Sequence, residues 1–252
     1  MRAITYLAPG IPLGFYEVVL RHVSRAIGES IDLTSDQCFS GPPPGERNPL
    51  APGAADLAFV CGPSYLRLAE DVRLGPAAPV FDDPRANGAP VYFAEVLVAA
   101  GRPERTLREL AGGRVAFNDP VSLSGRLSIL GHLGPGAQAR FGAVRWSGSH
   151  EASIAMLLAG EADVCTVDSV VWRRLTSERP ELADRLRVVE SLGPFPIQPV
   201  VASPALGDGA VERIAQALLS LGADELGAFG ARGFAPVDEA DYRPLAGVLA
   251  WV

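Results

Sequence analysis

Cysteine is scarce in this sequence. Cys38, Cys61 and Cys165 are scattered over 252 residues, with no Cys-x-x-Cys pair and no histidine nearby at metal-ligand spacing. An odd, dispersed set of this kind argues against a disulfide framework and against a zinc site, so we expect reduced cysteines and no bound metal. Cys61 and Cys165 lie in apolar runs and are most simply small core residues.

Basic residues, long apolar runs and nucleotide-binding motifs are also few or missing. The 22 basic residues are outnumbered by 29 aspartate and glutamate residues, which gives a formal charge of -7. Binding to a nucleic-acid backbone requires a basic surface, so the charge argues against a nucleic-acid partner. No apolar run reaches the roughly 18 residues of a membrane-spanning helix, so we expect no direct membrane insertion. There is neither a P-loop nor a Gly-x-Gly-x-x-Gly motif after a strand, and we expect no cofactor.

The first residues are typical of a strand rather than of a secretory leader. A leader combines a basic start, an apolar run and a small-residue cleavage site. Residues 1–7 instead read as a strand that runs into Pro9 and Gly10. From the sequence as written we expect a cytoplasmic protein, and a periplasmic one if a leader has been removed.

What the sequence does contain is a regular alternation of strand and helix patterns. Expected strands cover residues 2–7, 31–33, 56–61, 79–81, 91–98, 114–118, 142–146, 163–167, 186–189 and 195–202. Expected helices cover residues 13–27, 64–71, 123–133, 150–159, 169–177, 209–221, 223–231 and 242–250, with another from Thr106 and a Pro- and Gly-rich loop at 40–54. The alternation predicts an α/β fold with mixed, mostly parallel sheets and helices on both faces.

Two of the expected strands differ from the others. Tyr92 and Glu95 interrupt the apolar character of 91–98, and 195–202 contains two prolines. We interpret both as hinge strands. Residues 1–90 together with 200–252 would form lobe 1, and residues 95–193 would form lobe 2. Clefts at domain interfaces are where small ligands bind, so this layout predicts a cleft between the lobes.

The junction between the strand at 114–118 and the helix at 123–133 is a candidate anion site. It contains Ser122, Ser124 and Gly125. A helix start leaves backbone N–H groups unpaired and carries positive potential, so it can hold an oxyanion without a basic side chain. The alternative is that one of the two serines merely caps the helix.

Further polar residues follow other strands, at the edge where ligands bind in such sheets. His150 opens a helix and can donate to an oxyanion there, or it is simply exposed. Asp168 begins the next helix and either caps it or accepts a hydrogen bond from a ligand. Ser64 and Tyr65 follow the strand at 56–61.

Ser124, His150 and Asp168 invite comparison with a catalytic triad. The sequence around Ser124 is Val-Ser-Leu-Ser-Gly, which does not supply the Gly-x-Ser-x-Gly motif of a nucleophile elbow. We therefore favour ligand binding over hydrolysis.

Several segments taken together resemble a known family. They include Phe-Asn-Asp-Pro-Val-Ser-Leu-Ser-Gly at 117–125 and Ser-Gly-Ser-His at 147–150. The other matching segments are residues 55–65, 90–93, 160–169 and 193–196. In this order and spread they resemble the phosphate/phosphite/phosphonate-binding, PhnD-like branch of the type 2 periplasmic binding proteins of ABC transporters. The resemblance implies a two-lobed protein that closes on a small oxyanion.

The resemblance also implies roles for individual residues. Ser122, Ser124 and the Gly125 amide would hold the oxygens of the anion, His150 would add a donor, and Tyr92 would line the cleft. Aminophosphonate binders of the family carry an acidic residue near the position of Gln198. Because Gln198 is uncharged, a ligand ammonium loses its ion-pair partner, and we expect weak or no binding of aminophosphonates.

The leading hypothesis is a non-catalytic solute-binding protein for a small phosphonate- or phosphate-like ion, with an ABC permease as the candidate partner. The alternative is a cytoplasmic enzyme or ligand sensor on the same fold that acts on a small carboxylate. In the enzyme, Asp168, Glu95 or His150 would serve as acid or base.

Overall fold

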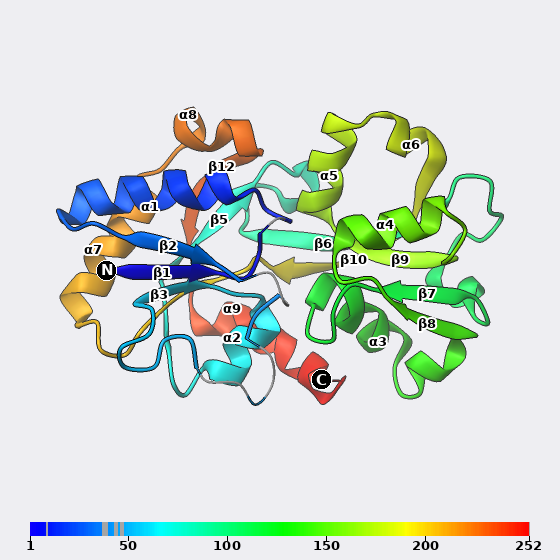
Figure 1. Ribbon diagram of the computed structural model, residues 1–252, viewed down its shortest axis with the longest axis horizontal. Helices are drawn as coiled ribbons and strands as arrows, with labels where there is room; N and C mark the ends of the chain where they lie inside the picture. Colours follow the sequence, from blue (N-terminus) through cyan, green and yellow to red (C-terminus); the bar gives the residue numbers. More distant parts are fainter. Residues whose placement is uncertain (9, 37–39, 43–44, 46–47, 252) are drawn as a thin grey trace. The chain divides into compact units, whose positions relative to one another are not determined.

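The computed structural model in Figure 1 describes all residues except 9, 37–39, 43–44, 46–47 and 252. Cys38 and part of the loop expected at 40–54 lie outside the described residues. The chain divides into two compact units. Unit 1 comprises Met1–Val91 and Pro196–Ala246, and unit 2 comprises Tyr92–Phe195 and Gly247–Val252. No helix in the described part of the chain combines the length and the apolar character needed to cross a membrane.

Unit 1 is built on a mixed sheet and a smaller antiparallel one. Its strands are Arg2–Thr5 (β1), Asp32–Ser35 (β2), Leu57–Phe59 (β3), Arg73–Leu74 (β4), Ala77–Phe81 (β5), Val200–Ala202 (β11) and Ala231–Pro236 (β12). The larger sheet has the order β2-β1-β3-β11-β4. β1 is parallel to β2 and β3, whereas β11 is antiparallel to β3 and β4. β5 and β12 pair antiparallel in the second sheet.

The helices of unit 1 pack around these sheets. They are Leu13–Ile27 (α1), Gly62–Leu68 (α2), Asp208–Leu219 (α7), Ala223–Leu226 (α8) and Glu239–Tyr242 (α9), with 3-10 turns at Pro84–Ala86 and Gly227–Phe229. A further 3-10 segment, Arg243–Trp251, begins in unit 1 and continues into unit 2 from Gly247. α1 has the expected bounds because its apolar residues recur at helical spacing and bury one stripe, which packs on α7. Gly28, with φ 74°, then ends α1 in the left-handed conformation that glycine adopts without strain.

Unit 2 has one five-stranded sheet, of order β10-β6-β9-β7-β8. The strands are Val91–Ala99 (β6), Arg114–Phe117 (β7), Ala143–Trp146 (β8), Val164–Asp168 (β9) and Leu186–Pro196 (β10). The helices are Ser128–Leu133 (α3), His150–Leu158 (α4), Ser169–Glu178 (α5) and Glu181–Arg185 (α6), with a π-helical turn at Leu123–Leu127 and 3-10 turns at Leu107–Leu110 and Ala137–Arg140. β7 is parallel to β8 and β9, and β6 is antiparallel to β9.

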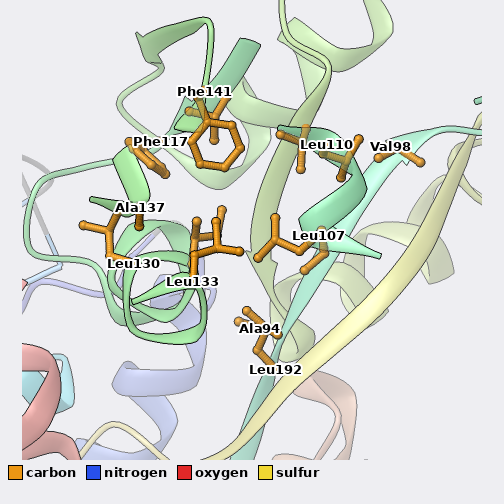
Figure 2. Close-up of a cluster of buried hydrophobic side chains, with 14 residues drawn as sticks. Ala94, Val98, Leu107, Leu110, Phe117, Leu130, Leu133, Ala137, Phe141 and Leu192 are labelled. Atoms are coloured by element: carbon orange, nitrogen blue, oxygen red, sulfur yellow. The ribbon is translucent and has the colours of Figure 1, made fainter. Parts of the chain in front are cut away.

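Helices cover both faces of the unit 2 sheet. Alternate residues of β7 enter different cores, with Val115 and Phe117 on one face and Ala116 on the other. Figure 2 shows the first core, where Phe117 lies among side chains that include Leu130 and Leu133 of α3. The second core receives side chains from α4, α5 and α6. A sheet buried on both faces needs apolar residues at successive positions, which explains the continuous apolar runs in the sequence.

Several expected elements are wrong in type or extent. The strand expected at 195–202 is divided, because β10 ends at Pro196 and β11 begins at Val200. Pro196 and Pro199 lack the N–H that a strand donates to its neighbour, so a continuous ladder cannot pass through them. The expected strand at 186–189 is instead the beginning of the long β10.

The helix expected over 223–231 stops early and is followed by the unexpected strand β12. Gly230, with φ 71°, ends the preceding 3-10 turn, and Gly233 accompanies a register shift in the pairing of β12 with β5. This strand forms because β5, which lies about 150 residues earlier in the chain, offers it an edge, and no local pattern signals that pairing. The helix expected from Thr106 is only a 3-10 turn, that at 242–250 is divided between α9 and a 3-10 turn, and α6 was not expected.

Candidate functional site

Seven of the predicted site residues lie in unit 2 and three in unit 1. Those in unit 2 are Tyr92, Glu95, Ser122, Ser124, Gly125, His150 and Asp168, and those in unit 1 are Ser64, Tyr65 and Gln198.

Ser122 caps the helical segment that follows β7. Its Oγ accepts a hydrogen bond from the Gly125 amide at 3.1 Å, and the hydroxyl keeps its own proton to donate. The Gly125 amide thus already has an acceptor in this structure. For that amide to bind a ligand oxygen, the Ser122 side chain must first turn away.

The segment begins with a π turn rather than with a regular α-helix. The amides of Arg126 and Leu127 both donate to the Ser122 carbonyl, at 3.2 and 3.0 Å. Gly125 is required in this turn because a Cβ there would overlap the side chain of Asn118. π turns are frequent at functional sites because they displace side chains from regular helical positions. Here the turn carries Ser124.

Ser124 and His150 meet at the carboxyl end of the unit 2 sheet. Ser124 Oγ lies 3.2 Å from His150 Nε2, although the residues are 26 positions apart. The loops that hold them are joined by backbone hydrogen bonds, because the amides of Ser147 and Gly148 donate to the carbonyls of Phe117 and Asn118, both at 2.9 Å. Parallel pairing of β7 with β8 thus brings the two loops together.

His150 is the first residue of α4, and Ser149 caps that helix by accepting from the Ala152 amide at 3.1 Å. Burial lowers the pKa of His150 from 6.5 to about 4, an effect that a hydrogen bond involving the Thr166 backbone partly offsets. The imidazole is therefore neutral at pH 7. Depending on the tautomer, Nε2 either accepts from the Ser124 hydroxyl or donates.

Asp168 is the N-cap of α5. Its Oδ1 accepts from the Val170 amide at 2.8 Å, which is the capping role that the sequence favoured. Contact of Asp168 with a ligand stays a prediction. The neighbouring Ser169 accepts from the Phe93 amide at 3.1 Å and so fixes the start of α5 against β6.

Tyr92 and Glu95 lie on β6, and both are buried. Glu95 accepts a hydrogen bond from the Ser191 hydroxyl at 2.5 Å. The Tyr92 ring packs against Phe195, with 6.1 Å between the ring centroids. Both side chains are thus engaged with β10, and their contact with a ligand also stays a prediction.

The three residues of unit 1 are buried as well. Ser64 Oγ accepts a hydrogen bond from Arg67 at 3.2 Å, and the Tyr65 ring packs edge-on against Tyr242 at 5.2 Å between centroids. Burial raises the pKa of Tyr65 above its usual value, so it stays a neutral phenol. Gln198 lies between β10 and β11 and is 8% exposed.

Three further polar residues of the two units, on a strand end, a strand and a helix, were not expected as site residues. Asn118 Oδ1 and Thr166 Oγ1 are buried and have no hydrogen-bond partner in the part of the chain that the structure describes. Arg67 contacts Ser64 in unit 1. A signal for Arg67 was present, because it lies one helical turn after Ser64 and long side chains on a helix point back towards its N-terminus. For Thr166, inside an apolar strand, no signal was present.

The sequence matches a family of known proteins. Residues 47–242 match a family model described as the periplasmic substrate-binding protein of phosphonate ABC transporters. No protein with a curated description matches the sequence.

Solved structures resemble this one closely in fold. A binding-protein component of an ABC phosphonate transporter from Pseudomonas aeruginosa has a TM-score of 0.79 at 17% identity, covering 98% of this chain and 84% of that one. PhnD1 from Prochlorococcus marinus, solved with methylphosphonate, has a TM-score of 0.78 at 16% identity, covering 98% and 96%. A Xanthomonas citri protein solved with ATP has a TM-score of 0.72 at 16% identity, covering 99% and 95%.

At such low identity the structural likeness establishes the fold alone, and it confirms the expected two-lobed type 2 periplasmic-binding-protein architecture. The family match is independent of that likeness and extends over 196 of the 252 residues. This chain belongs to the periplasmic substrate-binding proteins of phosphonate ABC transporters.

Proposed function

We propose that this protein binds a small phosphonate- or phosphate-like oxyanion in the periplasm and delivers it to an ABC permease. The observation that carries the proposal is the contact between Ser124 Oγ and His150 Nε2, at 3.2 Å, beside the Ser122 hydroxyl at the carboxyl end of the unit 2 sheet. Ligands bind at this edge in open α/β sheets.

The chemistry of this cluster suits an oxyanion. The Ser122 hydroxyl can donate a hydrogen bond to the ligand, and when His150 Nε2 donates to Ser124 Oγ the Ser124 hydroxyl can donate as well. The start of the helical segment adds positive potential. Hydrogen bonds to a charged oxygen are shorter and stronger than those between neutral groups. Such donors are directional, so they favour a ligand with several oxygens over a spherical anion.

Methylphosphonate is the first ligand to test, because the Prochlorococcus marinus neighbour was solved with it. Isothermal titration calorimetry should also include phosphate, phosphite, a small carboxylate and 2-aminoethylphosphonate. We expect the last to bind more weakly than methylphosphonate, because Gln198 offers no charge to an ammonium group.

The first variant is Ser124→Ala. Loss of one hydrogen bond to a charged oxygen should weaken the affinity for methylphosphonate by about tenfold or more. Ser220→Ala, an exposed serine of unit 1, is the control and should bind as the wild type does. If the folded wild-type protein binds none of these ions, the proposed function is wrong.

A further inference from the structure

Arg67 lies at the carboxyl end of β3 although its Cα is in the last turn of α2. Its Nη2 donates to the Ser64 hydroxyl at 3.2 Å and to the Pro42 carbonyl at 2.8 Å. Ser64 is in the first turn of α2, which starts three residues after β3 ends. The side chain therefore runs back along α2 and brings its guanidinium group to the edge of the unit 1 sheet.

The surroundings of Arg67 hold this position firmly. Gly41 packs directly on the Ser64 side chain, so closely that a Cβ at Gly41 would overlap the hydroxyl. The amide of Cys61 donates to the Ser40 carbonyl at 2.8 Å and joins the same loop to the start of α2. Ser64 is thus enclosed, and its described contact is with Arg67.

Arg67 differs from Arg73, Arg85 and Arg232 of unit 1 because both of its hydrogen-bond partners are neutral. Arg73, Arg85 and Arg232 each form an ion pair with an aspartate. No ion pair among the residues that the structure describes includes Arg67. Its Nε is buried and, in the same part of the chain, has no hydrogen-bond partner.

A partly buried cation without a carboxylate carries an uncompensated desolvation cost. Burial also lowers the pKa of the Arg67 guanidinium below its usual value. An anionic ligand offsets that cost. Because both hydrogens of Nη2 are donated to Ser64 and Pro42, the two hydrogens of Nη1 are the ones that would bind the oxygens of a phosphonate or phosphate group. The sequence contains no lysine, so a positively charged side chain that binds an anion must be an arginine or a histidine.

We propose that Arg67 is an anion-binding residue of this protein, with Ser64 and Pro42 as the groups that position it. The inference rests on the proposed function and assigns a charged anion contact within unit 1. It also gives Ser64 a positioning role in place of the ligand contact expected from the sequence.

The test compares Arg67→Gln, Arg67→Lys and the control Arg232→Gln by calorimetric titration with methylphosphonate. Loss of a charge-assisted hydrogen bond should make Arg67→Gln bind about tenfold to a hundredfold more weakly. Arg67→Lys keeps the charge but not the planar fork, so its affinity should fall between those of Arg67→Gln and the wild type. Arg232 is exposed and paired with Asp82, and Arg232→Gln should keep the wild-type affinity.

Ionic strength and melting temperature separate binding from a purely structural role. If Arg67 meets the anion, the wild-type affinity should decrease with added salt more steeply than that of Arg67→Gln. If Arg67 only fastens the loop at Pro42, Arg67→Gln will melt earlier and yet, while folded, bind with the wild-type dissociation constant, and the inference is overturned. Absence of binding by the wild type overturns the proposed function and this inference together, whereas wild-type binding with an unaffected Arg67→Gln overturns the inference alone.

Discussion

At the scale of single residues, position in the fold changes what a side chain can do. In the sequence, His150 is recognisable only as a histidine at a helix start. In the structure its Nε2 contacts Ser124 Oγ, and burial lowers its pKa below the ordinary value. The Gly125 amide already donates to Ser122 Oγ, whereas the Ser122 hydroxyl keeps its proton. The hydroxyl proton is therefore more available to a ligand than the Gly125 amide is.

The lowered pKa of His150 predicts a dependence of stability on pH. The folded pKa of about 4 is below the unfolded value of 6.5, so between these values the unfolded state binds more protons. His150 therefore contributes stability that is fully present above pH 6.5 and is lost as the pH falls towards 4. The free energy of unfolding should decrease over this range in the wild type, and decrease less in His150→Gln.

Denaturant unfolding from pH 7 to pH 4, with NMR titration of the His150 ring, measures both quantities. His22→Gln is the control, because His22 lies on α1 in unit 1, bonded to Ser220, and is not part of the Ser124–His150 contact. A His150 ring that titrates near 6.5 would contradict the prediction.

At the scale of elements, an ion-pair network joins the first residues of β7 and β9, at the edge of the sheet away from the candidate site. Asp163, which precedes β9, accepts from the Arg114 amide at 2.8 Å, from Arg114 Nε at 2.9 Å and from Arg102 Nη1 at 2.9 Å. Hydrogen bonding from the Arg114 side chain, more than any other contact, lowers the pKa of Asp163 from 3.8 to about 2. One carboxylate thus fixes the start of two neighbouring strands.

Asp163→Asn should lower the free energy of unfolding at pH 7 by about 1–3 kcal/mol, because it weakens charge-assisted hydrogen bonds at a partly exposed site. The folded pKa is below the unfolded pKa, so this contribution is present above pH 3.8 and is lost as the pH falls towards 2. The difference between wild type and variant should therefore shrink in acid. Asp184→Asn, an exposed residue of α6, serves as the control. A difference that grows on acidification would refute the assignment.

At the scale of the whole molecule, each unit has its own sheets, and the described site residues are distributed between both. A ligand that binds only the folded protein stabilises it by mass action, by about 2.7 kcal/mol at a concentration of 100 times the dissociation constant. For chains of this size that corresponds to a rise in melting temperature of roughly 5–10 °C.

Scanning calorimetry with and without methylphosphonate checks this rise. Ser124→Ala should need a concentration higher by the factor of its lost affinity to reach the same melting temperature. An unchanged melting temperature with every oxyanion tested would speak against ligand binding by the folded chain.

The sequence by itself determined the features that depend on local pattern. The apolar stripe and the closing Gly28 gave α1 its bounds, alternating strands and helices gave the α/β class, and the Ser-x-Ser-Gly segment marked the strand end where the candidate site lies. These signals are readable because caps and periodicity act within a few residues.

Only the tertiary structure decided which partners these residues meet. The contact of Ser124 with His150 depends on the pairing of β7 with β8, and strand β12 depends on an edge offered by the distant β5. The hydrogen bond of Ser64 with Arg67 forms because the Arg67 side chain runs back along α2, and contact of Ser64 with a ligand stays a prediction. Such contacts depend on the register of paired strands or on which residues share a helix face. The residues of each separate segment do not determine which distant segment it will meet.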